Sequence, residues 1–137
     1  MSCYKLATIP LLDTSNVTDM TGMFNSCKEL VSVPDLDYGK VTHLAQFIGV
    51  NNPDLASTKL ETIPDMSTVT SALTNCTKAF KNVVNAKYGI YDAYLALSSV
   101  NPANHDECFT NCGINTAEGR AQLEQIPESW GGLKVGE

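Results

Sequence analysis

The sequence LATIP at residues 6–10 recurs in this chain as LVSVP at 30–34, LETIP at 60–64 and LEQIP at 123–127. Each copy places a leucine three residues before an isoleucine or valine, and a proline follows directly. Four of the six prolines in the chain fall in this frame, so chance is a poor explanation. The pattern therefore indicates an internal repeat.

The first two copies stay in register well beyond the proline. Their leucines are 24 residues apart, and the same offset relates Val17 to Val41 and Phe24 to Ile48. The third copy starts 30 residues after the second, which indicates an insertion in the polar loop 49–59. The fourth copy lies 63 residues beyond the third, so the intervening sequence must contain an additional element.

Each repeat unit combines two different periodicities. The short apolar segment that ends at proline suits a β-strand, because proline cannot donate a hydrogen bond to a strand ladder. The polar residues 13–16 that follow in the first unit are of the types that cap helix N-termini. Val17, Met20, Met23, Phe24 and Cys27 then recur at spacings of three and four, which predicts one face of a helix.

These patterns predict an α/β fold: a short leucine-rich-repeat-like solenoid of strand-turn-helix units with a parallel sheet and one inserted helix. We expect one domain over residues 1–137, with repeat units at about 4–27, 28–57, 58–83 and 105–137 and the inserted helix at about 84–100. The strands are expected at 6–9, 30–33, 60–63 and 123–126. The expected core comprises Leu6, Ile9, Val17, Met20, Phe24, Leu30, Val33, Val41, Leu44, Leu60, Ile63, Phe80, Leu123 and Ile126.

The segment DTSNVTDMTGMFNSC at residues 13–27 resembles the repeat of BspA-like leucine-rich-repeat proteins, which also occurs in mycoplasma lipoproteins. The other units match this repeat mainly by their apolar frame, and residues 84–104 do not match it. The resemblance implies a surface or phage protein that acts in adhesion or protein binding. It favours a non-enzymatic interaction module that binds another protein through the solenoid surface. The alternative is a structural subunit of a phage virion, such as a capsid decoration or a fibre- or tail-associated protein.

Composition excludes several other classes of partner. The formal net charge is −6, which disfavours nucleic acid because a nucleic-acid binder needs a basic surface. No run of 18 apolar residues is present, so membrane insertion is not expected. The first residues lack the apolar region of a signal peptide, which favours the virion or the cytoplasm over classical secretion. The expected partner is another protein or a second copy of this chain.

The sequence offers few residues for catalysis or metal binding. His105, Cys108 and Cys112 have a spacing that could supply three zinc ligands, but Cys112 also matches Cys27 of the first repeat. No motif surrounds His43, the other histidine, so a cysteine–histidine nucleophile pair is not indicated. We therefore expect no enzyme activity, no cofactor and no metal site, and five cysteines that are mostly reduced and buried.

Acidic residues cluster just after the repeated prolines. Stacked carboxylates at such turns could bind calcium, which takes several oxygen ligands at once. Their register is imperfect, however, so capping of the following helices by a solvated edge is the favoured interpretation. These residues are Asp13, Asp35, Asp37, Asp54 and Asp65.

Two groups of apolar and aromatic residues are candidates for an interface. The first unit begins almost at residue 1, so its end of the stack is expected to contact another chain through Tyr4, Leu6, Leu12 and Phe24. Tyr88, Tyr91 and Tyr94 form a stripe at intervals of three, which either contacts a partner or packs the inserted helix on the stack. Trp130 follows the last repeat and is expected to cover the other end.

Truncation of a central leucine tests the assignment of the core. Leu30→Ala and Leu60→Ala should each lower the free energy of unfolding by about 2–5 kcal/mol, because each leaves a cavity among packed side chains. Chemical denaturation of each variant beside the wild type measures this loss. A loss below about 1 kcal/mol at both positions would show that the repeat is wrongly assigned.

Overall fold

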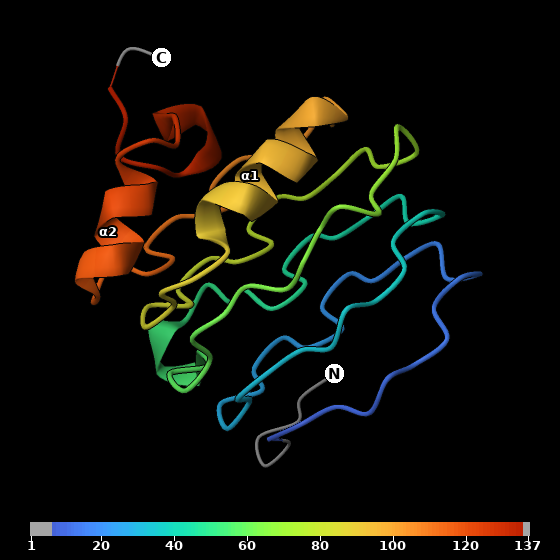
Figure 1. Cartoon of the computed structure of the whole chain (residues 1–137), viewed down its shortest axis with the longest axis horizontal. Helices are drawn as coiled ribbons and strands as arrows, with labels where there is room; N and C mark the ends of the chain where they lie inside the picture. Colours follow the sequence, from blue (N-terminus) through green and yellow to red (C-terminus); the bar gives the residue numbers. More distant parts are fainter. Residues whose placement is uncertain (1–6, 136–137) are drawn as a thin grey trace.

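Backbone hydrogen bonds between successive coils of the chain organise the computed structural model (Figure 1), which describes residues 7–135. The coils cover about 7–30, 31–60, 61–86 and 87–113, and the last one contains helix α1 (Ile90–Ser99). Helix α2 (Ala117–Leu123) follows, and two short 3₁₀ helices, η1 (Pro53–Leu55) and η2 (Glu128–Trp130), complete the elements.

Four segments, which we call the ladder runs, carry most of the hydrogen bonds between coils. They comprise residues 19–24, 43–48, 75–80 and 104–109. In the first run, the N–H groups of Met20, Gly22 and Phe24 donate to carbonyls of the second run at 2.8–3.0 Å. The second run donates to the third and the third to the fourth in the same alternating way, so all these bonds point in one direction along the stack.

The predicted repeat helices are wrong, because the ladder runs form successive turns instead. The N–H groups between the ladder donors bond within their own coil, as from Met23 to the carbonyl of Met20 at 3.1 Å. Equivalent positions of the four runs also have left-handed backbone with φ of 51–65°, which an α-helix cannot contain. These positions are Gly22, Gln46, Lys78 and Glu107. The apolar spacing of three and four therefore reflects tight turns that bury side chains.

The predicted strands and their parallel sheet are also wrong. Within residues 7–135 only isolated bridges occur, such as the parallel pair Thr62 and Tyr88, and there is no named strand. No backbone hydrogen bond joins 31–36 to 61–66 in this part of the chain. The fourth predicted strand pairs locally, since Leu123 and Ile126 accept from residues 133 and 134. The α/β solenoid of strand-turn-helix units is thus replaced by stacked irregular coils with two α-helices.

Threonine hydroxyls join the segments that lead back from one ladder run to the next. These segments, the return runs, comprise 7–13, 31–37 and 61–67. The buried hydroxyl of Thr14 donates to the carbonyl of Asp37 at 2.8 Å and accepts from its N–H at 2.9 Å. Thr68 does the same between the second and third coils, with Leu36 and Tyr38. One side chain thereby replaces the backbone pairing that a sheet would supply.

Helix α1 lies within the range expected for the inserted helix and starts at Ile90. Gly89 precedes it with φ of 81°, and a Cβ atom there would lie 2.7 Å from the carbonyl oxygen of Ile63. Glycine thus permits both the left-handed turn and the close approach of α1 to the third return run. The helix ends before Asn101, which is also left-handed, and Pro102. Ile90, Ala93 and Leu97 form its buried face.

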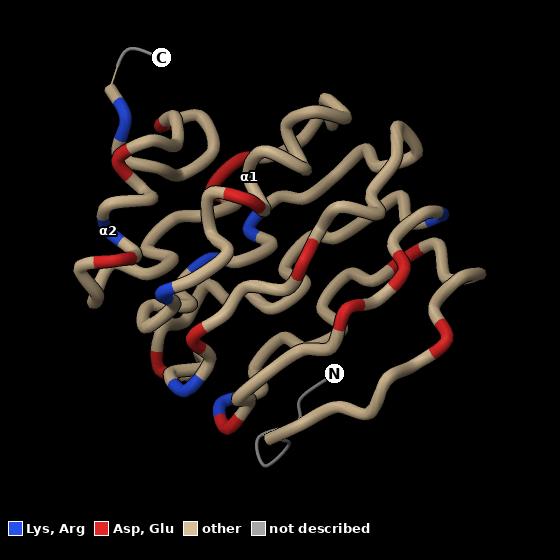
Figure 2. The backbone as a smooth tube through the Cα atoms, viewed as in Figure 1, with Lys and Arg blue, Asp and Glu red and all other residues tan. Residues whose placement is uncertain are grey.

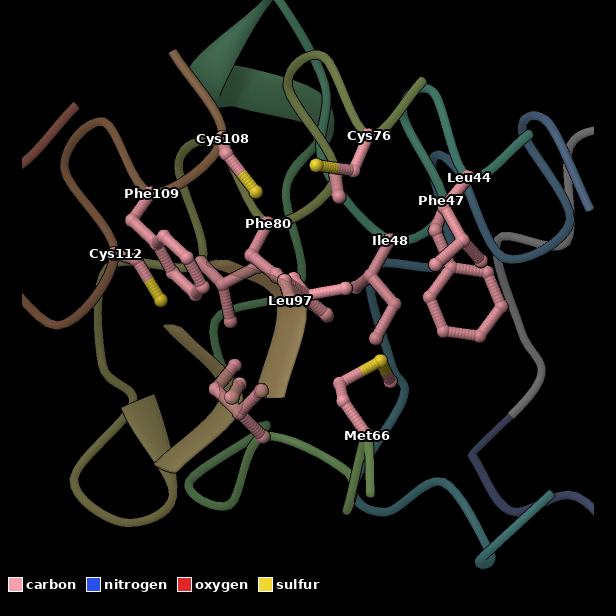
Figure 3. Close-up of a cluster of buried hydrophobic side chains, with 14 of the residues drawn as sticks. Leu44, Phe47, Ile48, Met66, Cys76, Phe80, Leu97, Cys108, Phe109 and Cys112 are labelled. Atoms are coloured by element: carbon pink, nitrogen blue, oxygen red, sulfur yellow. The ribbon is translucent and has the colours of Figure 1, made fainter. Parts of the chain in front are cut away.

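The core runs through all the coils as a continuous set of aromatic contacts. Phe47 lies 5.4 Å from Phe24 and 6.3 Å from Phe80 between ring centroids, and Phe80 stacks on Phe109 at 5.4 Å. Figure 3 shows Phe47, Phe80 and Phe109 among other buried side chains of this core. The aromatic rings therefore link coils that are far apart in sequence.

Most of the predicted core is confirmed. Ten of the expected residues are buried: Met20, Phe24, Leu30, Val41, Leu44, Leu60, Ile63, Phe80, Leu123 and Ile126. Ile9, Val17 and Val33 are only partly buried and pack against this core. Leu6 lies outside the described residues.

Substitution of Thr14 tests whether threonine hydroxyls hold the return runs together. Thr14→Val should lower the free energy of unfolding by about 1–3 kcal/mol, because it leaves the N–H and carbonyl of Asp37 without their buried partner. Chemical denaturation measures the change. Thr8→Val is the matched control, since Thr8 is exposed. Equal stability of the two variants would contradict a structural role for the Thr14 hydroxyl.

Candidate functional site

A groove of about 520 Å³ lies between α1 and the second and third return runs. Its apolar lining comes from Val33, Ile63, Pro64, Met66, Ala93 and Ala96. Its polar lining comes from Ser32, Asp35, Thr62, Asp65, Ser67 and Asp92, and Gly89 completes it. The groove therefore combines an apolar surface with hydroxyl and carboxylate groups, as sites for ligands and peptides commonly do.

Two features of the fold leave this space open. Residues 31–36 and 61–66 share no backbone hydrogen bond, and side-chain bonds of Ser57 and Thr68 hold the two coils at either end of that stretch. On the helix side, α1 presents Ala93 and Ala96, whose side chains are too short to fill the gap. The groove thus results from small residues placed beside an unpaired stretch of backbone.

Three carboxylates from three different elements surround the groove. Asp35 belongs to the second return run, Asp65 to the third and Asp92 to the first turn of α1. All three are exposed, and none forms an ion pair within residues 7–135. Asp65 accepts a hydrogen bond from the N–H of Ser67 at 2.8 Å. Figure 2 shows acidic residues recurring on successive coils and on α1.

The phenol of Tyr38 is buried within range of this acidic groove. Burial raises the pKa of Tyr38, and the charges of Asp35 and Asp65 raise it further. Its hydroxyl is the one buried side-chain polar atom without a hydrogen-bond partner within residues 7–135. The ring packs edge-on against Phe47 with centroids 5.8 Å apart. Tyr38 therefore acts as a neutral core residue and does not line the groove.

The predicted tyrosine stripe separates into two environments. Tyr91 and Tyr94 are partly buried and stack at 5.9 Å, and Tyr94 contacts Trp130 edge-on at 5.4 Å. Trp130 is buried and stacks in turn on the ring of His105 at 4.2 Å. This aromatic row packs α1 against the C-terminal segment. Tyr88 precedes the helix and is 55% exposed, so it is the tyrosine most available to a partner.

The N-terminal end of the stack presents apolar side chains and free carbonyls. Leu11 is 75% exposed and Leu12 is 38% exposed, whereas Phe24 is buried against Phe47. In the first ladder run, the carbonyls of Asp19, Thr21 and Met23 accept no hydrogen bond, although the equivalent carbonyls of the later runs do. Tyr4 and Leu6, the other residues predicted at this end, lie outside the described residues.

The residues considered as zinc ligands do not form one group. Cys108 and Cys112 are completely buried, and burial raises the pKa of both thiols. Figure 3 shows the sulfur of Cys108 pointing toward that of Cys76, and these three cysteines are free. His105 instead contacts the carbonyl of Ser129 at 3.1 Å through Nδ1. Cys27 is disulfide-bonded, so the prediction of a reduced thiol is wrong for this residue.

The acidic turns stabilise their own backbone. Asp13, Asp37 and Asp65 each accept from the N–H two residues later, at 3.1, 2.8 and 2.8 Å. Hydrogen bonds from Ser15 lower the pKa of Asp13. Because no repeat helix follows, these residues form side-chain turns and not helix caps. Within residues 7–135, no three histidine, cysteine or acidic side chains are placed to hold a metal ion together.

The sequence analysis missed the groove itself. It treated Asp35 and Asp65 as turn residues and did not consider Asp92, Ala93 or Ala96. A signal was present in 92–96, where one aspartate and two alanines follow a helical spacing. No protein-family model, curated protein or solved structure matches this chain. Among the described residues, no helix has the length and apolar character needed to cross a membrane.

Removal of the Tyr38 hydroxyl tests its unpaired state. Tyr38→Phe should leave the free energy of unfolding unchanged or raise it by about 1 kcal/mol, because a buried group without a partner is no longer desolvated. Thermal or chemical denaturation measures the shift, with Tyr91→Phe at a partly buried position as the control. A loss of more than about 1 kcal/mol would show that the hydroxyl has a stabilising partner.

Proposed function

We propose that this chain is a non-enzymatic interaction module that binds a segment of another protein in the groove beside α1. The observation that carries the proposal is the groove's open apolar lining, formed by Ile63, Met66 and Ala96 with other residues of the same elements. Apolar surface that meets hydroxyls and carboxylates is typical of protein interfaces, where an apolar centre supplies affinity and a polar rim supplies specificity.

The chemistry of the lining favours binding over catalysis. The lining contains no histidine, cysteine, lysine or arginine. Its serines and threonine therefore lack a neighbouring base that would activate them as nucleophiles. The carboxylate of Asp65 accepts from the backbone of Ser67, and this bond fixes a turn. The same groups are well suited to accept hydrogen bonds from a bound chain.

The shape of the groove favours an extended segment as the occupant. The groove lies between two stretches of backbone that share no backbone hydrogen bonds, 31–36 and 61–66. Thr62 and Ser32 line it, so polar groups of both stretches border the space. A segment bound there would bury its side chains against α1. The resemblance to BspA-like repeats is in keeping with a protein-binding role, and membership of that family remains a prediction.

Filling the groove should abolish binding. We expect short peptides selected from a random library on the wild-type protein to bind Ala96→Trp at least about tenfold more weakly, because the indole would occupy the apolar lining. Fluorescence anisotropy with labelled peptides measures the affinity. Leu95→Trp is the matched control, since Leu95 is an exposed residue of the same helix outside the groove. Equal affinity for both variants, or a library that yields no binder, would contradict the proposal.

A further inference from the structure

We infer that the natural occupant of the groove is a basic segment, in which arginine or lysine side chains flank small or apolar ones. This inference rests on the proposed function and adds the chemical class of the partner. The observation behind it is the position of Asp35, Asp65 and Asp92, one on each of the three elements that enclose the groove.

The carboxylates of the groove have no cation of their own. The three ion pairs among residues 7–135 use Glu29, Glu61 and Glu107, which do not line the groove. Their lysines, Lys59, Lys87 and Lys81, are therefore already paired with other carboxylates. A partner that brings cationic side chains would neutralise like charges that now share one space, and each contact would be a charge-assisted hydrogen bond.

A single metal ion would not satisfy this arrangement. Calcium and magnesium need several oxygen ligands converging on one point. Within the described part of the chain, no three acidic, histidine or cysteine side chains converge in this way. Carboxylates spread around a groove are instead matched by several cations attached to one chain, each reaching a different aspartate.

The apolar lining between these carboxylates defines the remainder of the partner. Ile63 and Met66 come from the third return run, and Ala93 and Ala96 come from α1. A purely polar polycation would leave this apolar surface without a contact. Leucine or alanine between the basic residues would bury it, and alternation along an extended chain would send successive side chains to opposite sides.

The charge of the whole chain favours the same partner. The formal net charge of −6 attracts a basic segment and repels an acidic one, and such steering raises association rates at low salt. Steering alone does not select a site. The combination of carboxylates with an apolar groove therefore determines where the segment binds.

The test uses two synthetic probe peptides and the full chain. In the first peptide, arginines alternate with leucine and alanine, and in the second, citrulline replaces every arginine. Citrulline keeps the shape of arginine and removes its charge. We expect the arginine peptide to bind at least about tenfold more tightly at low salt, and the difference to shrink as salt screens the charges. Fluorescence anisotropy measures both affinities.

Variants of the protein locate the binding. Asp35→Asn, Asp65→Asn and Asp92→Asn combined should lower affinity for the arginine peptide at least about tenfold. Asp54→Asn with Asp106→Asn, which changes exposed carboxylates outside the groove, should leave it within about twofold. Circular dichroism and thermal denaturation of each variant establish that it is folded.

The outcomes separate this inference from the proposed function. Equal binding of both peptides, lost in Ala96→Trp, would overturn the basic partner and leave the groove as a binding site. Binding of the arginine peptide that survives both Ala96→Trp and the triple substitution would show attraction to net charge elsewhere, and would overturn the inference. If neither these probes nor any library peptide binds at the groove, both the proposed function and the inference fail.

Discussion

The structure depends on a ladder of backbone hydrogen bonds that all point in the same direction along the stack. Alternate N–H groups of each ladder run donate to the next coil, as Met20 does to the carbonyl of His43 at 2.9 Å. The N–H groups between them close turns within their own coil. This division keeps each coil tight and bonded to its neighbour at once. A helix could not do both, because it uses its N–H groups internally.

The ladder fixes one side of the molecule and leaves the other side open to variation. The return runs are joined by the hydroxyls of Thr14 and Thr68 and by little backbone pairing. Insertions such as 49–59 and the helix α1 enter outside the ladder runs without disturbing the ladder. The groove beside α1 is a direct consequence, since it forms where backbone pairing is absent and the helix presents alanines.

The two ends of the stack are finished differently. At the C-terminal end, the carbonyl of Trp130 accepts from Phe109 at 2.9 Å, and the indole packs between Tyr94 and His105. At the N-terminal end, the carbonyls of the first ladder run have no donors, and Leu11 is exposed. Water satisfies such carbonyls at little cost. The charged groove is nevertheless the feature whose chemistry specifies a kind of partner.

The sequence by itself determined the repeat, its register and most of the buried residues. Side chains such as Leu30, Leu44 and Phe80 recur at a fixed offset, and burial follows hydrophobicity whatever the backbone conformation. The sequence also placed a helix within 84–100, where α1 is found, because an apolar periodicity there ends at Asn101 and Pro102.

Only the tertiary structure decided the backbone conformation of the repeats and the position of the groove. Spacings of three and four are common to helices and to successive tight turns, and the choice between them depends on hydrogen bonds to another coil. Asp35, Asp65 and Asp92 are likewise far apart in sequence, and only the stacking of coils beside α1 brings them to one groove. A local pattern records which side chains are buried, but it does not record which N–H group finds its acceptor in a neighbouring coil.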